Sequence, residues 1–353
     1  MKFMHISDLH LGISIKVRMS DSQKHKNRSL ENTERFFEVL KIAASNDVEY
    51  LFITGDLFDH PHVPIYFVEN VFETLSTLLM EVFITIGNHD TFLHNKTYQS
   101  IRDYANIHFF DDAHDVHRFK NIDVYGFSTK NFTESALQTV TENLDNTKQN
   151  VLCLHGDIRN AKDDHYLTDL KTLKALTFDY IALGHIHKHE FLDAHIAYAG
   201  NLEPFDFSET GSKGYIKGTL APFKATFYPI NKRHYKTLNI KINPQDSLQS
   251  IKEKLHKNTT SNERESDFLR VILEGEKDQS LIINRDATLY LSEDFYYLEL
   301  RDKSQLTLDL KALKKAYKDT IIEILIEDYE SHPEDSASLE KALRALLDSE
   351  VCL

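Results

Sequence analysis

The sequence predicts a layered α/β protein, and two observations lead to this prediction. Short apolar runs recur through the first 200 of the 353 residues, with amphipathic helical stretches between several of them. Several of these runs end in a cluster of Gly, Asp, Asn or His residues. In sheets that alternate with helices, functional groups gather at the carboxyl ends of the strands. The pattern therefore predicts both the fold class and the edge of the sheet at which a site is expected.

Strands and helices are expected to alternate through this first part. A helix is predicted over residues 30–44, because Phe36, Phe37, Leu40 and Ala44 share one face. Another helix is predicted to open after Pro64, since proline suits the first helical turn. Buried strands are expected at residues 2–7, 50–54, 81–86, 151–155 and 180–183.

The character of the sequence changes beyond Tyr235, where the polar clusters stop. A helix at 246–256 and strands at 268–274 and 295–300 are expected there, with a polar linker at 258–265. From residue 319 to 350 there are ten acidic residues against Lys341 and Arg344, which predicts an acidic helical tail interrupted at Pro333. We therefore expect a first domain over 1–235, a smaller α/β domain over 236–303 and a helical tail over 304–353.

Composition narrows the function classes. There are 41 basic and 55 acidic residues, a net charge of -14, which argues against coating nucleic acid by net charge but leaves room for a local basic groove. The two cysteines exclude a disulfide framework and favour a reducing compartment. No secretion signal is visible at the N-terminus, and no apolar run approaches the ~20 residues of a membrane helix. A cytoplasmic protein without a membrane anchor is expected.

Five polar clusters carry the chemical information. Carboxylate and imidazole groups together suit Mn, Fe or Zn, whereas the scarcity of cysteine argues against a thiolate site. A string such as Gly-Asn-His-Asp arises by chance about once in 160,000 positions at roughly 5% per residue type, so five such clusters in one chain are no coincidence. The clusters are Asp8-Leu9-His10, Gly55-Asp56-Leu57-Phe58-Asp59, Gly87-Asn88-His89-Asp90, His155-Gly156 and Gly184-His185-Ile186-His187.

The spacing within two clusters suggests how the ligands meet. In Asp8-x-His10 and His185-x-His187, alternate residues of an extended backbone point to the same side of the chain. We therefore expect each pair to reach a metal site from one short segment. The glycines before Asp56, Asn88 and His185 are expected to allow sharp turns and close approach.

The series Asp-x-His, Gly-Asp-x-x-Asp, Gly-Asn-His-Asp, His and Gly-His-x-His resembles the calcineurin-like metallophosphoesterase superfamily. This resemblance implies a sandwich of two mixed sheets flanked by helices, and a site for two divalent metal ions. One ion would be held by Asp8, His10, Asp56 and His187, and the other by Asp56, Asn88, His155 and His185, with Asp56 bridging the pair. His89 would face the phosphate, and the Asp59 carboxylate would orient it.

The chemistry suits this arrangement. Two ions about 3.5–4 Å apart lower the pKa of a shared water and stabilise the charge that builds up on phosphorus. His89 is then expected to donate a proton to the departing oxygen or to hydrogen-bond the transition state.

The run from Tyr180 to His187 and the run from Ala197 to Glu209 look like the SbcD-type DNA repair nucleases. That resemblance implies a Mn-dependent nuclease, with Mg, Fe or Zn as other candidates. It implies exonuclease action on duplex ends and endonuclease action on single strands or hairpins. It also implies a capping domain that selects DNA ends, a homodimer, and a coiled-coil ABC ATPase of the SbcC type that binds the C-terminal helices. His60 and His62 leave open a further imidazole near the phosphate.

Two other functions remain open at this point. One is a phosphodiesterase that acts on small nucleotides, although the ~120 residues after Tyr235 exceed what a minimal phosphoesterase domain needs. The other is a non-catalytic scaffold on the same fold. The complete set of expected ligands argues against the scaffold.

Two basic stretches are candidates for holding DNA. The predicted loop at 15–29 follows the ligand His10 and carries Lys16, Arg18, Lys24, Lys26 and Arg28. A second stretch, at 213–236, interleaves lysines and Arg233 with Tyr215, Tyr228 and Tyr235, a mixture that suits single strands. A solvated surface is the alternative interpretation of both stretches.

Overall fold

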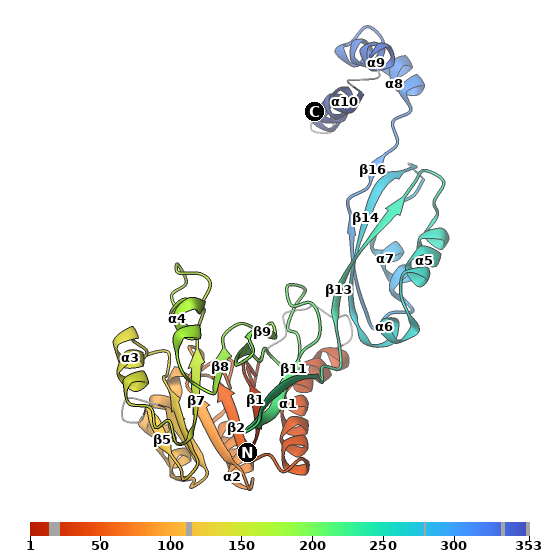
Figure 1. Cartoon of the computed structure of the whole chain (residues 1–353). Coiled ribbons are helices and arrows are strands. Elements are labelled where there is room, and N and C mark those ends of the chain that lie inside the picture. Colours follow the sequence, from red (N-terminus) through yellow and green to blue (C-terminus); the bar gives the residue numbers. More distant parts are fainter. Residues whose placement is uncertain (14–21, 111–114, 279, 333–335, 351–353) are drawn as a thin grey trace. The chain divides into compact units, whose positions relative to one another are not determined.

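The computed structural model describes residues 1–13, 22–110, 115–278, 280–332 and 336–350. The chain forms two compact units (Figure 1). Unit 1 contains Met1–Thr237, Ser261–Arg270 and Phe295–Leu298, and unit 2 contains Leu238–Thr260, Val271–Asp294 and Glu299–Leu353. Two segments of the predicted 236–303 domain therefore pack with unit 1.

Unit 1 holds two mixed sheets. In the first sheet β1, β2, β3 and β4 are parallel, and β11 is antiparallel to β1 and β12. Its order is β12 (Phe223–Pro229), β11 (Gly214–Leu220), β1 (Lys2–Ile6), β2 (Tyr50–Thr54), β3 (Glu81–Thr85) and β4 (Ile107–Phe110).

The second sheet has parallel strands at its centre and antiparallel strands at its edges. Its order is β5 (Val116–Arg118), β6 (Ile122–Gly126), β7 (Gln149–His155), β8 (Tyr180–Gly184), β10 (Ile196–Tyr198) and β9 (Glu190–Asp193). Both sheets thus direct carboxyl ends of parallel strands toward a common edge, as the sequence predicts.

Alternation of side chains along the strands explains the layers. In β2, Phe52 packs in the core between the two sheets, whereas Leu51 and Ile53 pack outward. In β7, Cys153 faces the inner core and Leu152 faces the outer one. Every strand that alternates in this way is buried on both faces, so the sheets require helices outside them.

Helices cover both outer faces of the sandwich (Figure 1). Phe36 of α1 and Phe72 of α2 pack on the first sheet, and Leu137 of α3 and Leu173 of α4 pack on the second. The helices of unit 1 are α1 (Ser22–Ser45), α2 (Ile65–Ser76), α3 (Glu134–Glu142), α4 (Leu170–Ala175) and α6 (Ser261–Ser266), with the 3₁₀ helices η1 (Thr91–His94) and η2 (Lys96–Asp103).

Two predicted segments differ from the structure. Helix α1 begins at Ser22, eight residues before the predicted start, so residues 22–29 are helical and not part of a loop. The predicted linker at 258–265 contains α6, whose residues belong to unit 1.

Unit 2 contains most of a third sheet and the C-terminal helices. Strands β13 (Tyr235–Ile242), β14 (Phe268–Lys277) and β15 (Tyr297–Asp302) lie side by side, and β16 (Gln305–Leu306) pairs with β14. In the helical tail, Ile322, Ile326 and Leu343 are buried against one another. The helices of unit 2 are α5 (Leu248–Lys257), α7 (Arg285–Ser292), α8 (Leu310–Ala316), α9 (Ile321–Ser331) and α10 (Ser336–Glu350).

Candidate metal centre

Left-handed backbone brings the polar clusters together. Asp8, His10, Asp56 and His185 all have positive φ angles, of 53°, 43°, 50° and 96°. Such angles cost of order 1–3 kcal/mol in residues other than glycine and are concentrated at functional sites. The prediction that Asp8 and His10 meet through an extended backbone is therefore wrong: β1 ends at Ile6, and tight turns carry both side chains.

Glycines permit the close approach of strand ends at this edge, within the first sheet and between the two sheets. A Cβ atom on Gly184 would lie 1.8 Å from the carbonyl oxygen of Thr54, and one on Gly87 would lie 2.2 Å from Asp56 Oδ1. These positions cannot carry a side chain without displacing the strand ends beside them. The chain thus places β2, β3 and β8 close enough for their ligands to converge.

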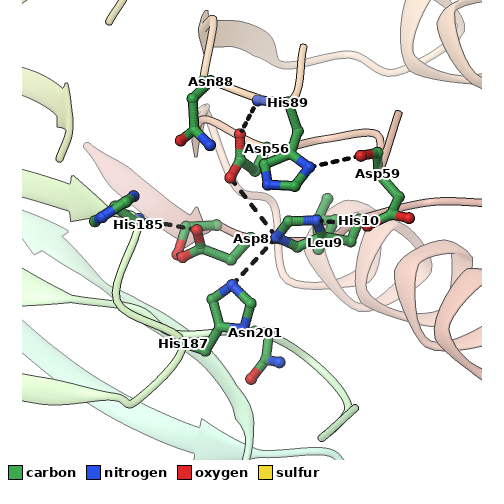
Figure 2. Close-up of polar contacts among 12 residues, drawn as sticks. Asp8, Leu9, His10, Asp56, Asp59, Asn88, His89, His185, His187 and Asn201 are labelled. Atoms are coloured by element: carbon green, nitrogen blue, oxygen red, sulfur yellow. Dashed lines mark hydrogen bonds and ion pairs between the residues drawn. The ribbon is translucent and has the colours of Figure 1, made fainter. Parts of the chain in front are cut away.

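One group of ligand atoms joins Asp8, His10 and His187, which lie within 4.8 Å of one another. The Nε2 atoms of His10 and His187 face each other at 3.1 Å (Figure 2). Asp8 is fully buried, and His10 is nearly so. These are three of the four residues expected to hold the first ion; the fourth, Asp56, belongs to the second group.

A second group joins Asp8, Asp56 and His155, again within 4.8 Å. His155 Nε2 lies 3.3 Å from Asp56 Oδ2 and 3.1 Å from Asn88 Oδ1. The same Oδ2 atom lies 3.6 Å from His10 Nε2 (Figure 2), so Asp56, a member of the second group, also approaches the first. This position is the one predicted for a bridging carboxylate.

His185 lies at the edge of the second group. Its ring centroid is 5.3 Å from that of His155, and its Nε2 atom is 3.7 Å from Asp163 Oδ1. Its backbone N–H donates to Asp8 Oδ1 at 2.8 Å. The residue therefore joins the cluster of predicted ligands, although no set of three close ligand atoms among the described residues includes it.

The electrostatics of this cluster fit cations. Burial alone raises the pKa of Asp56, but His155 and His10 together hold it well below its usual range. Burial lowers the pKa of His155, and Asp56 outweighs that effect and raises it to about 9. Two buried carboxylates so close together need positive charge, which the histidines supply here and which divalent ions supply with stronger ligation. The donor set of carboxylate, imidazole and amide oxygen suits two such ions.

The contact between His89 and Asp59 involves a different oxygen atom of Asp59 from the one expected. His89 Nδ1 donates to the backbone carbonyl oxygen of Asp59 at 2.6 Å, whereas the Asp59 carboxylate lies 3.2 Å from His10 Nδ1. The expectation that the carboxylate orients His89 is therefore wrong, because the carbonyl occupies that place. His60 Nδ1 accepts the backbone N–H of His62 in an exposed turn.

Asp90 is a supporting residue to which sequence reasoning assigned no role. Its carboxylate accepts the backbone N–H groups of Leu57 and Phe58 at 2.9 and 2.8 Å. Burial and the charge of Asp56 raise the pKa of Asp90 to about 6. The residue links the turn after β2 to the turn after β3. Its place at the end of the Gly-Asn-His-Asp string is the feature of the sequence that could have drawn attention to it.

The predicted DNA contact at Arg28 is also wrong. Arg28 is fully buried, donates to Glu31 and to the carbonyl oxygen of Pro204, and lies 3.6 Å from Glu203. It holds α1 to the segment after β10 and cannot reach a ligand. Lys16 and Arg18 lie outside the described residues, as do the side chains of Lys24 and Lys26.

Several residues of the second basic stretch are buried in the fold. Lys213 and Arg233 are buried, and Arg233 donates to Glu31 at 2.6 Å. Lys217 Nζ lies 4.9 Å above the ring of Tyr228 and donates to Asn46. Tyr235 is buried as well. Within the stretch, Lys217 and Tyr228 pack against each other, and with Lys224 they also line a cavity of about 220 Å³.

A cavity of about 410 Å³ opens over the clusters. His10, His89 and His187 face it, and Phe205 adds an aromatic ring 5.5 Å from each of the rings of His10 and His187. The remaining lining residues are Ile13, Asp56, Asp59, Asn88, His185, Asp206 and Glu209. Neither arginine nor lysine lines the cavity within the described part of the chain.

Residues 1–189 match the sequence profile of the family described as calcineurin-like phosphoesterase. The uncharacterized metallophosphoesterase YhaO of Bacillus subtilis is 28% identical over 239 residues, which cover 60% of this chain and 56% of that protein. The DNA double-strand break repair protein Mre11 of Thermoplasma acidophilum is 30% identical over 61% of this chain and 59% of its own length. The protein of the same name from Saccharolobus solfataricus is 25% identical over 96% of this chain and 93% of its own.

The chain thus spans less than two thirds of the length of the first two relatives. Among solved structures, TT1561 of Thermus thermophilus is 12% identical with a TM-score of 0.43, covering 65% of this chain and 98% of its own. A dimetal phosphatase of Danio rerio is 12% identical with a TM-score of 0.39, covering 62% of this chain and 91% of its own. No helix within the described residues is long and apolar enough to cross a membrane.

Proposed function

Because this chain belongs to the calcineurin-like phosphoesterase family, we propose that it is a DNA nuclease that hydrolyses phosphodiester bonds with two divalent metal ions, Mn²⁺ first among them. The observation that carries the proposal is the pair of ligand groups that share Asp8 and reach toward Asp56, beneath a cavity faced by His89. Similarity to proteins named for double-strand break repair, over nearly the whole chain in one case, supports DNA as the substrate.

The cavity lining favours a diester over a monoester. A phosphomonoester carries close to two negative charges at neutral pH. The described lining offers imidazole, amide and carboxylate groups. A diester carries one charge, so it is repelled less by Asp59 and Asp206 at the cavity wall.

The residues of the site would then have separate roles in metal binding and proton transfer. Asp8, His10, Asp56 and His187 would hold one ion, and Asp56, Asn88, His155 and His185 the other. When bound, such a pair supplies an activated water and charge that stabilises the phosphoryl oxygens. His89 Nδ1 carries its hydrogen toward the Asp59 carbonyl. In its imidazolium form the ring would carry a second hydrogen on Nε2, which it would give to the leaving oxygen.

We also propose that the protein works as a homodimer with an SbcC-type ATPase in the cytoplasm. Ile321 and Ile324 of α9 are more than half exposed, which suits a partner surface on the helical tail. In the helical tail, Ile326 of α9 and Leu343 of α10 are buried against one another, so only part of the apolar surface of these helices remains for a partner.

The test is cleavage of a 5′-labelled duplex, a hairpin and bis-p-nitrophenyl phosphate with Mn²⁺ or Mg²⁺ by the wild type and by His89→Asn. The proposal predicts Mn²⁺-dependent cleavage of both DNAs, and a loss of at least about 100-fold in the variant, as expected for removal of a general acid. Equilibrium dialysis should show that the variant still binds Mn²⁺, because His89 is not among the proposed ligands.

A second candidate is a phosphodiesterase of small nucleotides, because a cavity of about 410 Å³ is large enough for a nucleotide. Turnover of the small diester without either DNA would favour this candidate. Bound Mn²⁺ without turnover of any substrate would contradict both and point to a scaffold.

A further inference from the structure

The carboxylate of Glu209 touches the metal cluster from outside the ligand set. Its Oε1 atom accepts the Nδ1–H of His187 at 2.7 Å, on the side of the ring opposite to Nε2. The Nε2 atom faces His10 Nε2 at 3.1 Å, inside the first ligand group. A carboxylate oxygen only accepts hydrogen bonds, so the hydrogen of a neutral His187 ring stays on Nδ1 and the Nε2 lone pair points into the cluster.

The other oxygen of Glu209 is held by hydrogen-bond donors alone. Oε2 accepts from Asn201 Nδ2 at 2.6 Å and from the backbone N–H of Phe205 at 3.3 Å, and Lys213 Nζ lies 3.2 Å away. Lys213 is buried and also donates to the carbonyl oxygen of His187 at 2.7 Å. These contacts fix the orientation of the carboxylate, with one oxygen committed to the ring of His187.

We propose that Glu209 is a positioning residue that fixes the tautomer and ring orientation of His187 for metal binding. Asn201 and Lys213 hold Glu209 in place. Outer partners of this kind raise the affinity of a histidine site, and their loss typically costs 10–100-fold in metal affinity. The inference rests on the metal-binding part of the proposed function and holds whether DNA or a small diester is the substrate.

Glutamine at this position provides a sharp test, because it has nearly the same shape but carries both an acceptor and a donor. The donors around Oε2 would repel its amide group, so the amide turns toward His187. An N–H aimed at Nδ1 requires a lone pair there, which moves the hydrogen of His187 to Nε2. The variant should therefore place a hydrogen where the metal binds.

Alanine behaves differently, because water can enter the space and accept the Nδ1–H of His187. We expect Glu209→Gln to weaken Mn²⁺ binding by about 10–100-fold and Glu209→Ala to weaken it less. Thermal unfolding should give the opposite order, with Glu209→Ala the less stable variant because Asn201, Phe205 and Lys213 lose their acceptor.

Equilibrium dialysis measures the Mn²⁺ affinities of the full-length variants, and thermal unfolding measures their stabilities. Asp206→Asn is the matched control, since it removes one negative charge from the same loop and the same cavity wall without touching the His187 ring. It should lose much less affinity than Glu209→Gln. If Glu209→Gln binds Mn²⁺ as well as Glu209→Ala or better, Glu209 has only a structural role. If the wild type itself fails to bind Mn²⁺, the proposed function fails instead.

Discussion

His5 is a fully buried imidazole in β1 that joins three strands. One ring nitrogen lies 2.8 Å from the hydroxyl of Tyr180 in β8, and the other lies 2.9 Å from Thr54 Oγ1 in β2. Burial, with a smaller contribution from His189, lowers the pKa of His5 to about 3. The folded protein therefore keeps this ring neutral at pH values where the unfolded chain protonates it.

The sign of the pH dependence follows from that difference. Above pH 6.5 the ring is neutral in both states, and the stabilisation is complete. Between pH 6.5 and 3 only the unfolded chain takes up the proton, so the free energy of unfolding falls by about 1.4 kcal/mol for each pH unit. Urea unfolding at pH 7.0, 5.5 and 4.5 should show this loss. In His5→Gln the loss over the same range should be smaller; an equal loss would contradict the assignment.

Motif residues such as Asp56, Asn88 and His155 could be identified from the sequence because their types and order are chemically specific. The role of Glu209 could not, because it arises from a hydrogen bond across the fold. Asp90 belongs to the Gly-Asn-His-Asp string, but its contact with the turn after β2 follows only from the folded structure. Arg28 shows the converse error. A basic residue in a polar stretch looks solvated, yet tertiary contacts with Glu31 and Pro204 bury it.

The ends of β2 and β8 meet so closely that a methyl group should separate them. The backbone carbonyl of Thr54, which accepts the Nδ1–H of His155 at 2.8 Å, would lie 1.8 Å from a Cβ atom at Gly184. We expect Gly184→Ala to reduce the free energy of unfolding by at least about 3 kcal/mol, as collisions in a packed core do, and to weaken Mn²⁺ binding through His155. Urea unfolding and equilibrium dialysis measure both effects.

Gly211→Ala is the matched control. A Cβ atom there meets no atom within 4 Å, although φ is +89°. The substitution should therefore cost only the ~1–2 kcal/mol of a left-handed residue and leave Mn²⁺ binding intact. Equal effects of the two substitutions would show that backbone conformation, and not the meeting of the strands, governs the result.

Strands were predicted more accurately than helix boundaries. The strands alternate between two buried faces, as Leu51 and Phe52 do, so each leaves a continuous apolar run in the sequence. The first turns of α1 lack such a pattern, since residues 22–29 are mostly polar. In these turns Arg28 contacts Pro204, which lies far away in the sequence. A prediction from local sequence patterns does not include such a contact.

The two units divide the chain in a way that truncation can test. Apolar side chains of α8, α9 and α10 pack mainly against one another, so a chain that ends after residue 307 should keep an intact unit 1. We expect its hydrolysis of bis-p-nitrophenyl phosphate to stay within about twofold of the full chain, since α8, α9 and α10 supply none of the candidate ligands and form a cluster of their own. Steady-state kinetics and thermal unfolding provide the comparison.

A chain that ends after residue 237 is expected to behave differently. It lacks Phe268, whose ring stacks on Tyr235 at 4.5 Å, and Ser266, whose carbonyl oxygen accepts a hydrogen bond from Arg233. Both contacts lie within unit 1, so this chain should unfold at a lower temperature than the one ending at 307. Equal melting temperatures would show that unit 1 is complete without these segments. The domain boundary expected at residue 235 leaves these segments out, because the chain leaves unit 1 after Thr237 and returns to it at Ser261 and at Phe295.

The candidate ligands come from both sheets, with Asp8 and Asp56 following β1 and β2, and His155 and His185 at the ends of β7 and β8. An ion bound by ligands from both sheets joins the two halves of the sandwich. The unfolded chain offers no such assembled site. Its binding free energy is then added to the free energy of unfolding, by about 2.7 kcal/mol when free metal exceeds the dissociation constant 100-fold. Metal supply thereby governs how long the protein survives as well as how fast it works, and a cell short of the ion would hold fewer folded copies.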